Sequence, residues 1–423
     1  MTFAIFVGGS RGDIDPYLAL GAALAGRGHR VRLCGAPAHG QAAARAGLGF
    51  AALGADPARA DGPETLARAH GSLAGLLGGI RRQTVPAMPA RFAHARRACT
   101  DADVLVASPL TVPLAVSIGE ALDRPVVRAF YSPASPTAAY PSIVLPQSWR
   151  LPGPVNRWSH HLTSRVALLP FRRSLNQARR DVLGLGPIAA DPLRALDAQQ
   201  VPVLYGYSPL VCPPPADFGS HVHVTGYWRP PHLDWTPPAA LLRFLDAGPP
   251  PVYVGFGSMV APDPRALTTV VVATLAQMGL RGVLGRGWGG LTPVDAPHVH
   301  VVDDVPHAWL FPRVRAAVHH GGAGTTGASL TAGLATVTIP FGMPDQSFWG
   351  TQVSRLGVGP RPVPRRHLTT ERLQDALRAA LDGPVQARAR RLGEAIRRED
   401  GLATAVGVLE RWLTSRTAAG LRR

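Results

Sequence analysis

The 423-residue chain contains no lysine, so its 44 basic residues are all arginines, set against 27 acidic residues. A formal net charge of +17 favours nucleic acid or an anionic membrane as a partner. The sequence, however, has no RNP motif, no zinc-finger spacing and no basic stretch interleaved with aromatic residues, so nucleic-acid binding is not predicted. Peripheral contact with a membrane surface remains compatible with the charge.

Cysteine is scarce as well. The three cysteines, Cys34, Cys99 and Cys212, lie far apart and form no CxxC pair, which argues against a disulfide framework and for a reducing compartment. The sequence has no apolar run of about 18 residues, and no charged region precedes the short apolar run near residue 1. Neither a membrane span nor a signal peptide is therefore predicted, and we expect a cytoplasmic protein.

Several catalytic motifs are also absent. Without HExxH or GxxxxGK[ST], the sequence does not support a zinc protease or a Walker-type NTPase. His298 and His300 would share one face of a strand, with Asp303, Asp304 and His307 nearby. Such alternation usually marks the exposed face of a strand, so no metal site is predicted.

What the sequence does contain is two series of alternating strand and helix patterns. The run "FAIFVGG" at 3–9 predicts a buried strand, and the segments after it predict a helix ending at Gly28 and a second strand. A second series starts with "PPVYVGFGSM" at 250–259. Because β-α-β units build parallel sheets covered by helices, we predict an α/β protein with two doubly wound, Rossmann-like domains facing a central cleft.

The predicted domain boundaries follow the composition. Residues 1–210 form the N-terminal domain, a proline-rich linker holding a short strand covers 211–238, and the C-terminal domain covers 239–400. Residues 401–423 are predicted as a C-terminal helix that packs back on the N-terminal domain. Between 140 and 190 the pattern is irregular and suits a cap or a wall for an apolar, ring-like acceptor, although Trp149 and Trp158 there are expected in the core rather than in such a wall.

Small and polar residues follow the predicted strands where such sheets bind their ligands, beyond the carboxyl ends. After "AAV", the glycines of "HHGGAGTT" allow a tight turn, and the following helix N-terminus suits a phosphate. The alternative is a structural turn in which His320 only caps the helix. Asp13 likewise either caps a helix or accepts a proton in the cleft, and Asp15, before Pro16, fits the simple N-cap better.

Together these segments resemble a known family. "GGSRGDIDPYLALGAALAGRGHRV", "VYVGFGSM", "GWGGL", "HHGGAGTTGASLTAG", "PFGMPDQSFWG" and "REDGLATAV" are similar to motifs of family 1 glycosyltransferases of the GT-B fold. The similarity is greatest to the sterol glucosyltransferase-like group and to bacterial natural-product (glycopeptide-type) enzymes of antibiotic biosynthesis and secondary metabolism. It is strongest at 5–35 and 251–405, whereas 140–240 show no motif, as befits an acceptor-binding region.

The resemblance implies an inverting, metal-independent transfer of a hexose from a UDP- or dTDP-sugar to a hydroxyl of a lipophilic acceptor, a sterol or a natural-product aglycone. Asp13 is implied as the general base. By the same resemblance, the glycine turn and His320 are implied to contact the diphosphate. Trp288 and Val305 are implied to contact the nucleotide base, and Asp345 and Gln346 to bind the sugar hydroxyls. The implied donor-binding residues are Ser10, Arg11, Gly12, Ser258, Trp288, Val305, His320, Gly322, Gly324, Thr325, Asp345 and Gln346.

Two departures from the family pattern stand out. The segment between Pro340 and Asp345 is one residue longer than usual, and Ser108 stands where a carboxylate that orients a histidine base is expected. No partner for Asp13 is predicted. A monomer or weak dimer is expected, with no cofactor. The alternatives are a nucleotide-sugar epimerase on the same scaffold and a non-catalytic, glycosyltransferase-like auxiliary protein.

Overall fold

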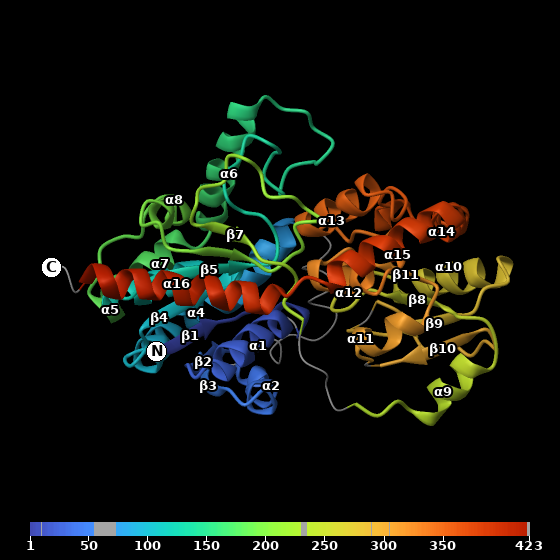
Figure 1. The fold of residues 1–423 in the computed structure, drawn as a ribbon, viewed down its shortest axis with the longest axis horizontal. Coiled ribbons are helices and arrows are strands. Elements are labelled where there is room, and N and C mark those ends of the chain that lie inside the picture. The colour runs from blue at the N-terminus through green and yellow to red at the C-terminus, as the bar shows by residue number, and fades with distance from the viewer. Residues whose placement is uncertain (10, 55–72, 230–234, 289, 304, 421–423) are drawn as a thin grey trace.

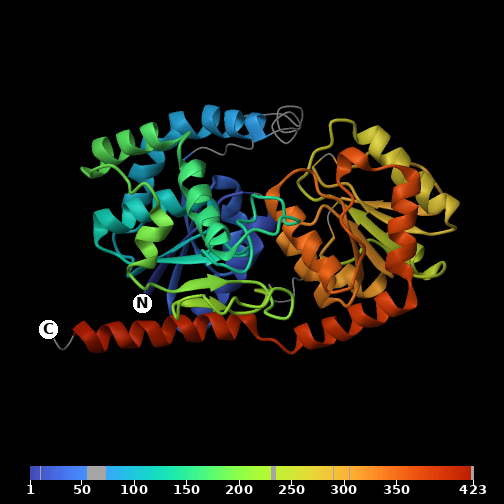
Figure 2. The ribbon, with the colours of Figure 1, turned by 90° about the horizontal axis from the view of Figure 1, so that it is seen from above.

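The computed structural model describes residues 1–9, 11–54, 73–229, 235–288, 290–303 and 305–420. The chain forms two α/β domains side by side, with a long C-terminal helix that returns along the first (Figures 1 and 2). The predicted fold class, two domains built on parallel sheets, is confirmed.

The first sheet has seven parallel strands among the described residues, in the order β3-β2-β1-β4-β5-β6-β7. The central strands are fully buried because continuous apolar runs such as "TFAIF" fill both faces of a covered parallel sheet. The strands are β1 (Thr2–Phe6), β2 (Arg30–Gly35), β3 (Gly49–Ala52), β4 (Val104–Ala107), β5 (Val126–Phe130), β6 (Val203–Tyr205) and β7 (Val222–Val224).

Strand β7 comes from the segment that the sequence assigned to the linker at 211–238. It pairs with β6 in parallel, so the first domain continues at least to Val224. The helices of this domain are α1 (Arg11–Gly26), α2 (Gly40–Arg45), α4 (Leu73–Ala98), α5 (Val112–Leu122), α6 (Gly153–Leu168), α7 (Arg172–Ala178) and α8 (Pro192–Asp197).

The second sheet has five parallel strands in the described part of the chain, in the order β10-β9-β8-β11-β12. They are β8 (Val252–Gly255), β9 (Gly282–Gly285), β10 (Val299–Val302), β11 (Ala316–His319) and β12 (Ala335–Thr338). The helices are α9 (Ala239–Asp246), α10 (Pro264–Gln277), α11 (His307–Leu310), α12 (Ala323–Thr331), α13 (Pro344–Arg355), α14 (Thr370–Leu381) and α15 (Gly383–Arg397). Asp263 caps α10 by accepting the Ala266 N–H at 2.9 Å.

Helix α16 (Gly401–Gly420) leaves the second domain and packs along α1 of the first (Figure 2). Its buried Ala405 and Leu409 join Tyr17, Leu20 and Leu24 of α1 in one apolar cluster. The chain thus crosses between the domains twice, which limits how they can move. In the described residues, the helices are too short or too polar to span a membrane.

Both sheets reverse their strand order at one place. The first sheet reverses between β1 and β4, and the second between β8 and β11. Loops at such a switch point diverge above the strand ends and leave room for a ligand. The loops after these four strands are therefore the place to look for a site.

Candidate active site

The loop after β1 delivers Asp13 to the edge of the first sheet. Gly9 adopts φ +108°, a backbone conformation that residues with a side chain rarely adopt. A Cβ on Gly9 would lie 2.4 Å from Asp13 Oδ2, so the loop also packs directly against the carboxylate. Asp13 itself is half-buried in the first turn of α1. Of the neighbouring predicted residues, Ser10 lies outside the described residues, and the Arg11 backbone begins α1.

Tyr131, directly after β5, is the partner of Asp13. Its hydroxyl donates a hydrogen bond to Asp13 Oδ1 at 2.8 Å. Burial and then the nearby Asp13 charge raise the pKa of Tyr131 well above its usual range, so it stays protonated and donates. Ser108, which the sequence singled out, is buried instead beside Thr111, with 3.1 Å between their hydroxyl oxygens.

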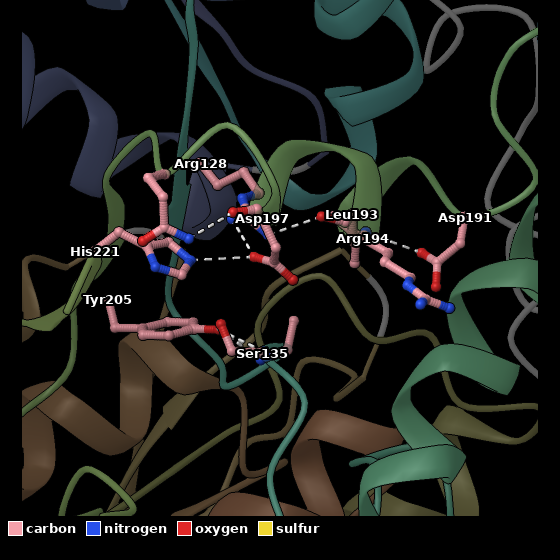
Figure 3. A network of polar contacts seen from close by, with 10 residues as sticks. Arg128, Ser135, Asp191, Leu193, Arg194, Asp197, Tyr205 and His221 are labelled. Atoms are coloured by element: carbon pink, nitrogen blue, oxygen red, sulfur yellow. Dashed lines mark hydrogen bonds and ion pairs between the residues drawn. The ribbon is translucent and has the colours of Figure 1, made fainter. Parts of the chain in front are cut away.

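The loop that carries Tyr131 is fixed by Tyr205 of β6. The Tyr205 oxygen accepts the backbone N–H groups of Ala134 and Ser135 at 2.9 and 2.7 Å. It donates its own proton to Ser135 Oγ at 2.8 Å, as Figure 3 shows. Three hydrogen bonds to one buried hydroxyl hold the loop in place, and with it the donor to Asp13.

A second network of polar contacts involves the strand that precedes Tyr131. The buried Arg128 of β5 forms an ion pair with Asp197 at 2.5 Å between Nη2 and Oδ1, and Nη1 donates to the Leu193 carbonyl at 3.4 Å (Figure 3). His221, just before β7, contacts the same Asp197 oxygen at 3.3 Å. This network ties α8 and β7 to the strand that precedes Tyr131, so the edge is rigid.

In the second domain, the two histidines after β11 have different environments. His319 is fully buried: its Nδ1 accepts the Gly321 N–H at 2.9 Å, and its Nε2 lies 3.5 Å from Ser329 Oγ. His320 has a buried Nδ1 without a hydrogen-bond partner among the described residues. Burial, and then the neighbouring His307, lower the pKa of His320 to about 4. At neutral pH the His320 ring is therefore uncharged, and its unpartnered Nδ1 is enclosed beside the glycine turn.

The glycine turn opens α12 toward the first domain. Gly322 is the N-cap, and no side chain caps the helix, so the amides of its first turn are available to a ligand. Gly324 is exposed, and a Cβ on it would lie 3.6 Å from the Gly12 carbonyl oxygen. Helices α1 and α12 contact each other. Two helix N-termini, each with a partial positive charge, therefore meet at one place.

Residues 322, 324 and 327 also have the GxGxxG spacing of dinucleotide-binding folds. That fingerprint belongs after the first strand of its domain, whereas this turn follows β11, the fourth strand along the second domain. The spacing of the glycines thus favours an anion at the helix N-terminus without identifying a dinucleotide. Thr325 is half-buried in the same first turn.

Asp345 and Gln346 begin α13 but have different roles. Burial and then the Asp13 charge raise the pKa of the half-buried Asp345 to about 6, so two carboxylates from different domains influence each other. Gln346 is buried: its Oε1 accepts the Phe341 N–H at 2.7 Å, and its Nε2 lies 3.1 Å from Met259 Sδ. A sugar contact from the Gln346 side chain would require these interactions to break.

The remaining predicted residues lie around β8. Ser258 is half-buried in the turn after this strand, where Gly257 has φ +59°. Trp288 donates its backbone N–H to the Gly257 carbonyl at 3.1 Å, and its ring is 47% exposed, so it can stack on a ligand. The Val305 side chain is buried in the core of the second domain, so only its backbone can face a ligand.

Helix α13 belongs to the second domain and packs against residues of the first. Trp349 donates from Nε1 to Ser132 Oγ at 3.1 Å, and its ring packs edge-on against Tyr207 with centroids 5.3 Å apart. Phe348 packs against Tyr140 at 6.0 Å. Because Ser132 follows Tyr131, this contact brings the α13 N-terminus beside the Asp13 loop.

The chain is similar to known proteins along both of its domains. The Glycosyltransferase family 28 N-terminal domain model matches residues 3–141, and the Erythromycin biosynthesis protein CIII-like, C-terminal domain model matches 292–403. A sterol 3-beta-glucosyltransferase of Emericella nidulans is 37% identical over 98% of this chain, and one of Arabidopsis thaliana is 34% identical over 98%. The chain belongs to the GT-B glycosyltransferase family.

The chain spans 30% of the length of the Emericella relative and 66% of the Arabidopsis relative. Among solved structures, the calicheamicin glycosyltransferase CalG4 superimposes with a TM-score of 0.68 at 20% identity, covering 98% of both chains. The glycosyltransferase VinC in complex with dTDP superimposes with a TM-score of 0.66 at 20% identity, covering 97% of this chain and 99% of VinC. These structural likenesses confirm the predicted fold.

The structure also holds candidate site residues that sequence reasoning missed. Tyr131 stands directly after a strand, at the same sheet edge as Asp13, and that position was a usable signal. Trp349 gave no such signal, because its partner Ser132 lies 217 residues away. Among the described residues, no three of His, Cys, Asp and Glu gather as metal ligands. His300, weighed above as a metal ligand, instead stacks on Phe244.

Proposed function

We propose that this chain transfers a hexose from a nucleoside diphosphate sugar to a hydroxyl of a lipophilic acceptor, with inversion at the anomeric carbon. The observation that carries the proposal is the meeting of three groups at one place: the Asp13 carboxylate from the first domain, and the N-termini of α12 and α13 from the second. An acceptor hydroxyl beside Asp13 would then face a sugar whose diphosphate lies at α12.

In the proposed reaction, Asp13 takes the proton from the acceptor hydroxyl, and that oxygen attacks C1 of the sugar from the side opposite the diphosphate. The new C1–O bond forms as the bond to the diphosphate breaks, which inverts the configuration. The hydrogen bond from Tyr131 holds the Asp13 carboxylate in its orientation. Asp345 would accept hydrogen bonds from sugar hydroxyls.

The leaving diphosphate would gain negative charge in the transition state. The facing N-termini of α1 and α12 carry partial positive charges that repel each other, and an anion between them removes this repulsion. The unused His320 nitrogen adds one further donor. Because such fixed donors stabilise developing charge, we propose that no metal is required, and activity should survive EDTA.

The acceptor class is proposed from the named relatives. Sterol 3-beta-glucosyltransferases are similar over almost the whole chain, which favours a sterol-like acceptor and a glucose donor. A thymidine diphosphate complex among the structural neighbours makes dTDP-sugars the second donor to test. Natural-product aglycones are the second acceptor class.

The test is a transfer assay with UDP- and dTDP-glucose against sterol, polyketide and peptide acceptors, with products identified by mass spectrometry. Asp13→Asn should lower the turnover number by roughly 10²–10⁴-fold while the protein still folds and binds nucleotide. Full turnover in that variant would remove Asp13 from its proposed role. A new nucleotide sugar formed without acceptor would favour an epimerase, and donor binding with no product over the panel would favour an auxiliary protein.

A further inference from the structure

Helix α6 has its polar and apolar faces reversed relative to a usual surface helix. Its buried face is polar: Asn156 Nδ2 donates to the Ala138 carbonyl at 2.9 Å, and Ser159 Oγ accepts the Ser142 N–H at 2.9 Å. His160 Nε2 lies 3.1 Å from the Tyr140 carbonyl oxygen. These bonds attach the helix firmly to the loop before it.

The same face is fixed to α8. Asp191, the N-cap of α8, contacts His161 Nδ1 at 3.0 Å and accepts the Ser164 hydroxyl at 2.7 Å. It also accepts the Arg194 N–H at 3.2 Å, the contact drawn in Figure 3. These polar contacts together hold α6 in one rotation about its axis, so its outward face is set by the fold.

The outward face is apolar. It consists of five large side chains at helical spacing, each between 41% and 60% exposed, here termed the α6 stripe: Val155, Trp158, Leu162, Val166 and Leu169. Val144 and Trp149 in the preceding loop are 49% and 51% exposed. The sequence predicted core positions for Trp149 and Trp158, and that was wrong. Seven of the twelve exposed large hydrophobic side chains of the described residues belong to this one region.

Figure 1 shows where this region lies: α6 rises above the rest of the first domain, at the top of the view. Contiguous exposed apolar surface on a soluble protein usually marks an interaction site. The α6 stripe is therefore a candidate docking surface, and the charge around it indicates the kind of partner that it would bind.

The segment from 131 to 180 contains seven arginines and no aspartate or glutamate. Three of the seven pair with carboxylates outside the segment, Arg157 with Asp217, Arg179 with Glu120 and Arg180 with Asp181, which leaves four to carry the positive charge of this region. Arg150, Arg165 and Arg173 are exposed beside or on α6. A second copy of this chain would bring the same positive charge against it, so self-association on this face is electrostatically unfavourable. An anionic lipid surface complements both features, because tryptophan and leucine enter the headgroup boundary while arginine binds phosphates.

We propose that the α6 stripe, with Val144 and Trp149, docks the first domain on an anionic lipid bilayer. The helix would lie in the plane of the membrane, with the stripe inserted and Arg150, Arg165 and Arg173 at the headgroups. This attachment would keep a transferase close to acceptors dissolved in the bilayer. It does not depend on catalysis, because the contact uses neither Asp13 nor the donor-binding loops.

The experiment is co-sedimentation of the full chain with vesicles of phosphatidylcholine, with and without phosphatidylglycerol, in the absence of donor and acceptor. Trp158→Gln with Leu162→Gln should lower the partition coefficient at least roughly tenfold, since each side chain loses its insertion. Arg150→Gln with Arg165→Gln should lower binding to anionic vesicles about fivefold per arginine and leave neutral vesicles unaffected. Leu242→Gln with Arg243→Gln on α9 is the matched control and should change neither.

Thermal melting and UDP binding by calorimetry report whether each variant is folded. The proposal is overturned if the stripe variant binds vesicles as tightly as the wild type, or if the α9 control loses as much binding. It is also overturned if light scattering shows a dimer that only the stripe variant disrupts, because the occupant is then a second copy. A failed transfer assay with intact vesicle binding would count against the proposed function alone.

Discussion

Replacing Asp345 by asparagine is expected to stabilise the free protein at neutral pH. Asp345 is half-buried, and burial together with the Asp13 charge raises the pKa of its carboxyl to about 6. Asparagine keeps a side-chain oxygen for the local backbone N–H groups but carries no charge. The substitution therefore removes the cost of an ionised group next to another carboxylate, and leaves the shape of the site nearly unchanged.

The sign follows from the two protonation states. An aspartate in the unfolded chain has a pKa of about 3.9, whereas the pKa of Asp345 in the folded protein is about 6. The folded state binds more protons in this window, so wild-type stability falls as the pH rises from about 4 to about 6. Two pKa units correspond to about 3 kcal/mol, and partial solvent exposure reduces this to roughly 1–2 kcal/mol.

Differential scanning calorimetry of the ligand-free protein from pH 4 to pH 8 measures this effect. The advantage of Asp345→Asn should be near zero at about pH 4, grow to about pH 6 and then remain constant. At about 2–4 °C per kcal/mol, the plateau is a rise in Tm of roughly 3–6 °C. Asp303→Asn, an exposed aspartate paired with Arg286, is the control and should show no such rise.

A constant difference at every pH, or a lower Tm than the wild type at pH 8, would refute the reasoning. The first result would mean that Asp345 has the same pKa in the folded and unfolded states, and the second that its charge is stabilised by a partner. Donor affinity adds an independent readout: if Asp345 accepts hydrogen bonds from the sugar, the stabler variant should bind the nucleotide sugar more weakly, with unchanged affinity for the free nucleotide.

Tyr131→Phe removes the donor to Asp13 and should lower kcat roughly tenfold or more with little change in donor KM; an additional loss in the Asp13→Asn background would show that Tyr131 acts elsewhere. Gly9→Ala places a Cβ 2.4 Å from Asp13 Oδ2 at φ +108° and should lower both Tm and turnover; normal kinetics would disprove the close packing. His320→Gln should weaken UDP binding roughly tenfold by calorimetry without lowering Tm, whereas His319→Gln should lower Tm; equal effects of the two would contradict their different environments.

Local patterns in the sequence determined much of the architecture. Apolar runs that end in glycine predicted buried parallel strands, since a strand covered on both faces needs such a run. Strand ends share one edge of a parallel sheet, so the order of residues along the chain was enough to assign Asp13, Ser258 and His320 to sheet edges. The family could be predicted from the sequence because its motifs are short, continuous segments of the chain. Ligand contacts of these residues stay predictions.

The tertiary structure alone decided what depends on contacts between distant segments. Tyr131 reaches Asp13 from 118 residues away, and the inward turn of Gln346 depends on Met259. Strand β7 pairs in parallel with β6 at the edge of the first sheet, and the proline-rich pattern around β7 does not predict this pairing. Helix α6 shows the reason most clearly: its pattern predicts which residues share a face, but only its hydrogen bonds to the loop before it and to α8 decide that the apolar face points outward.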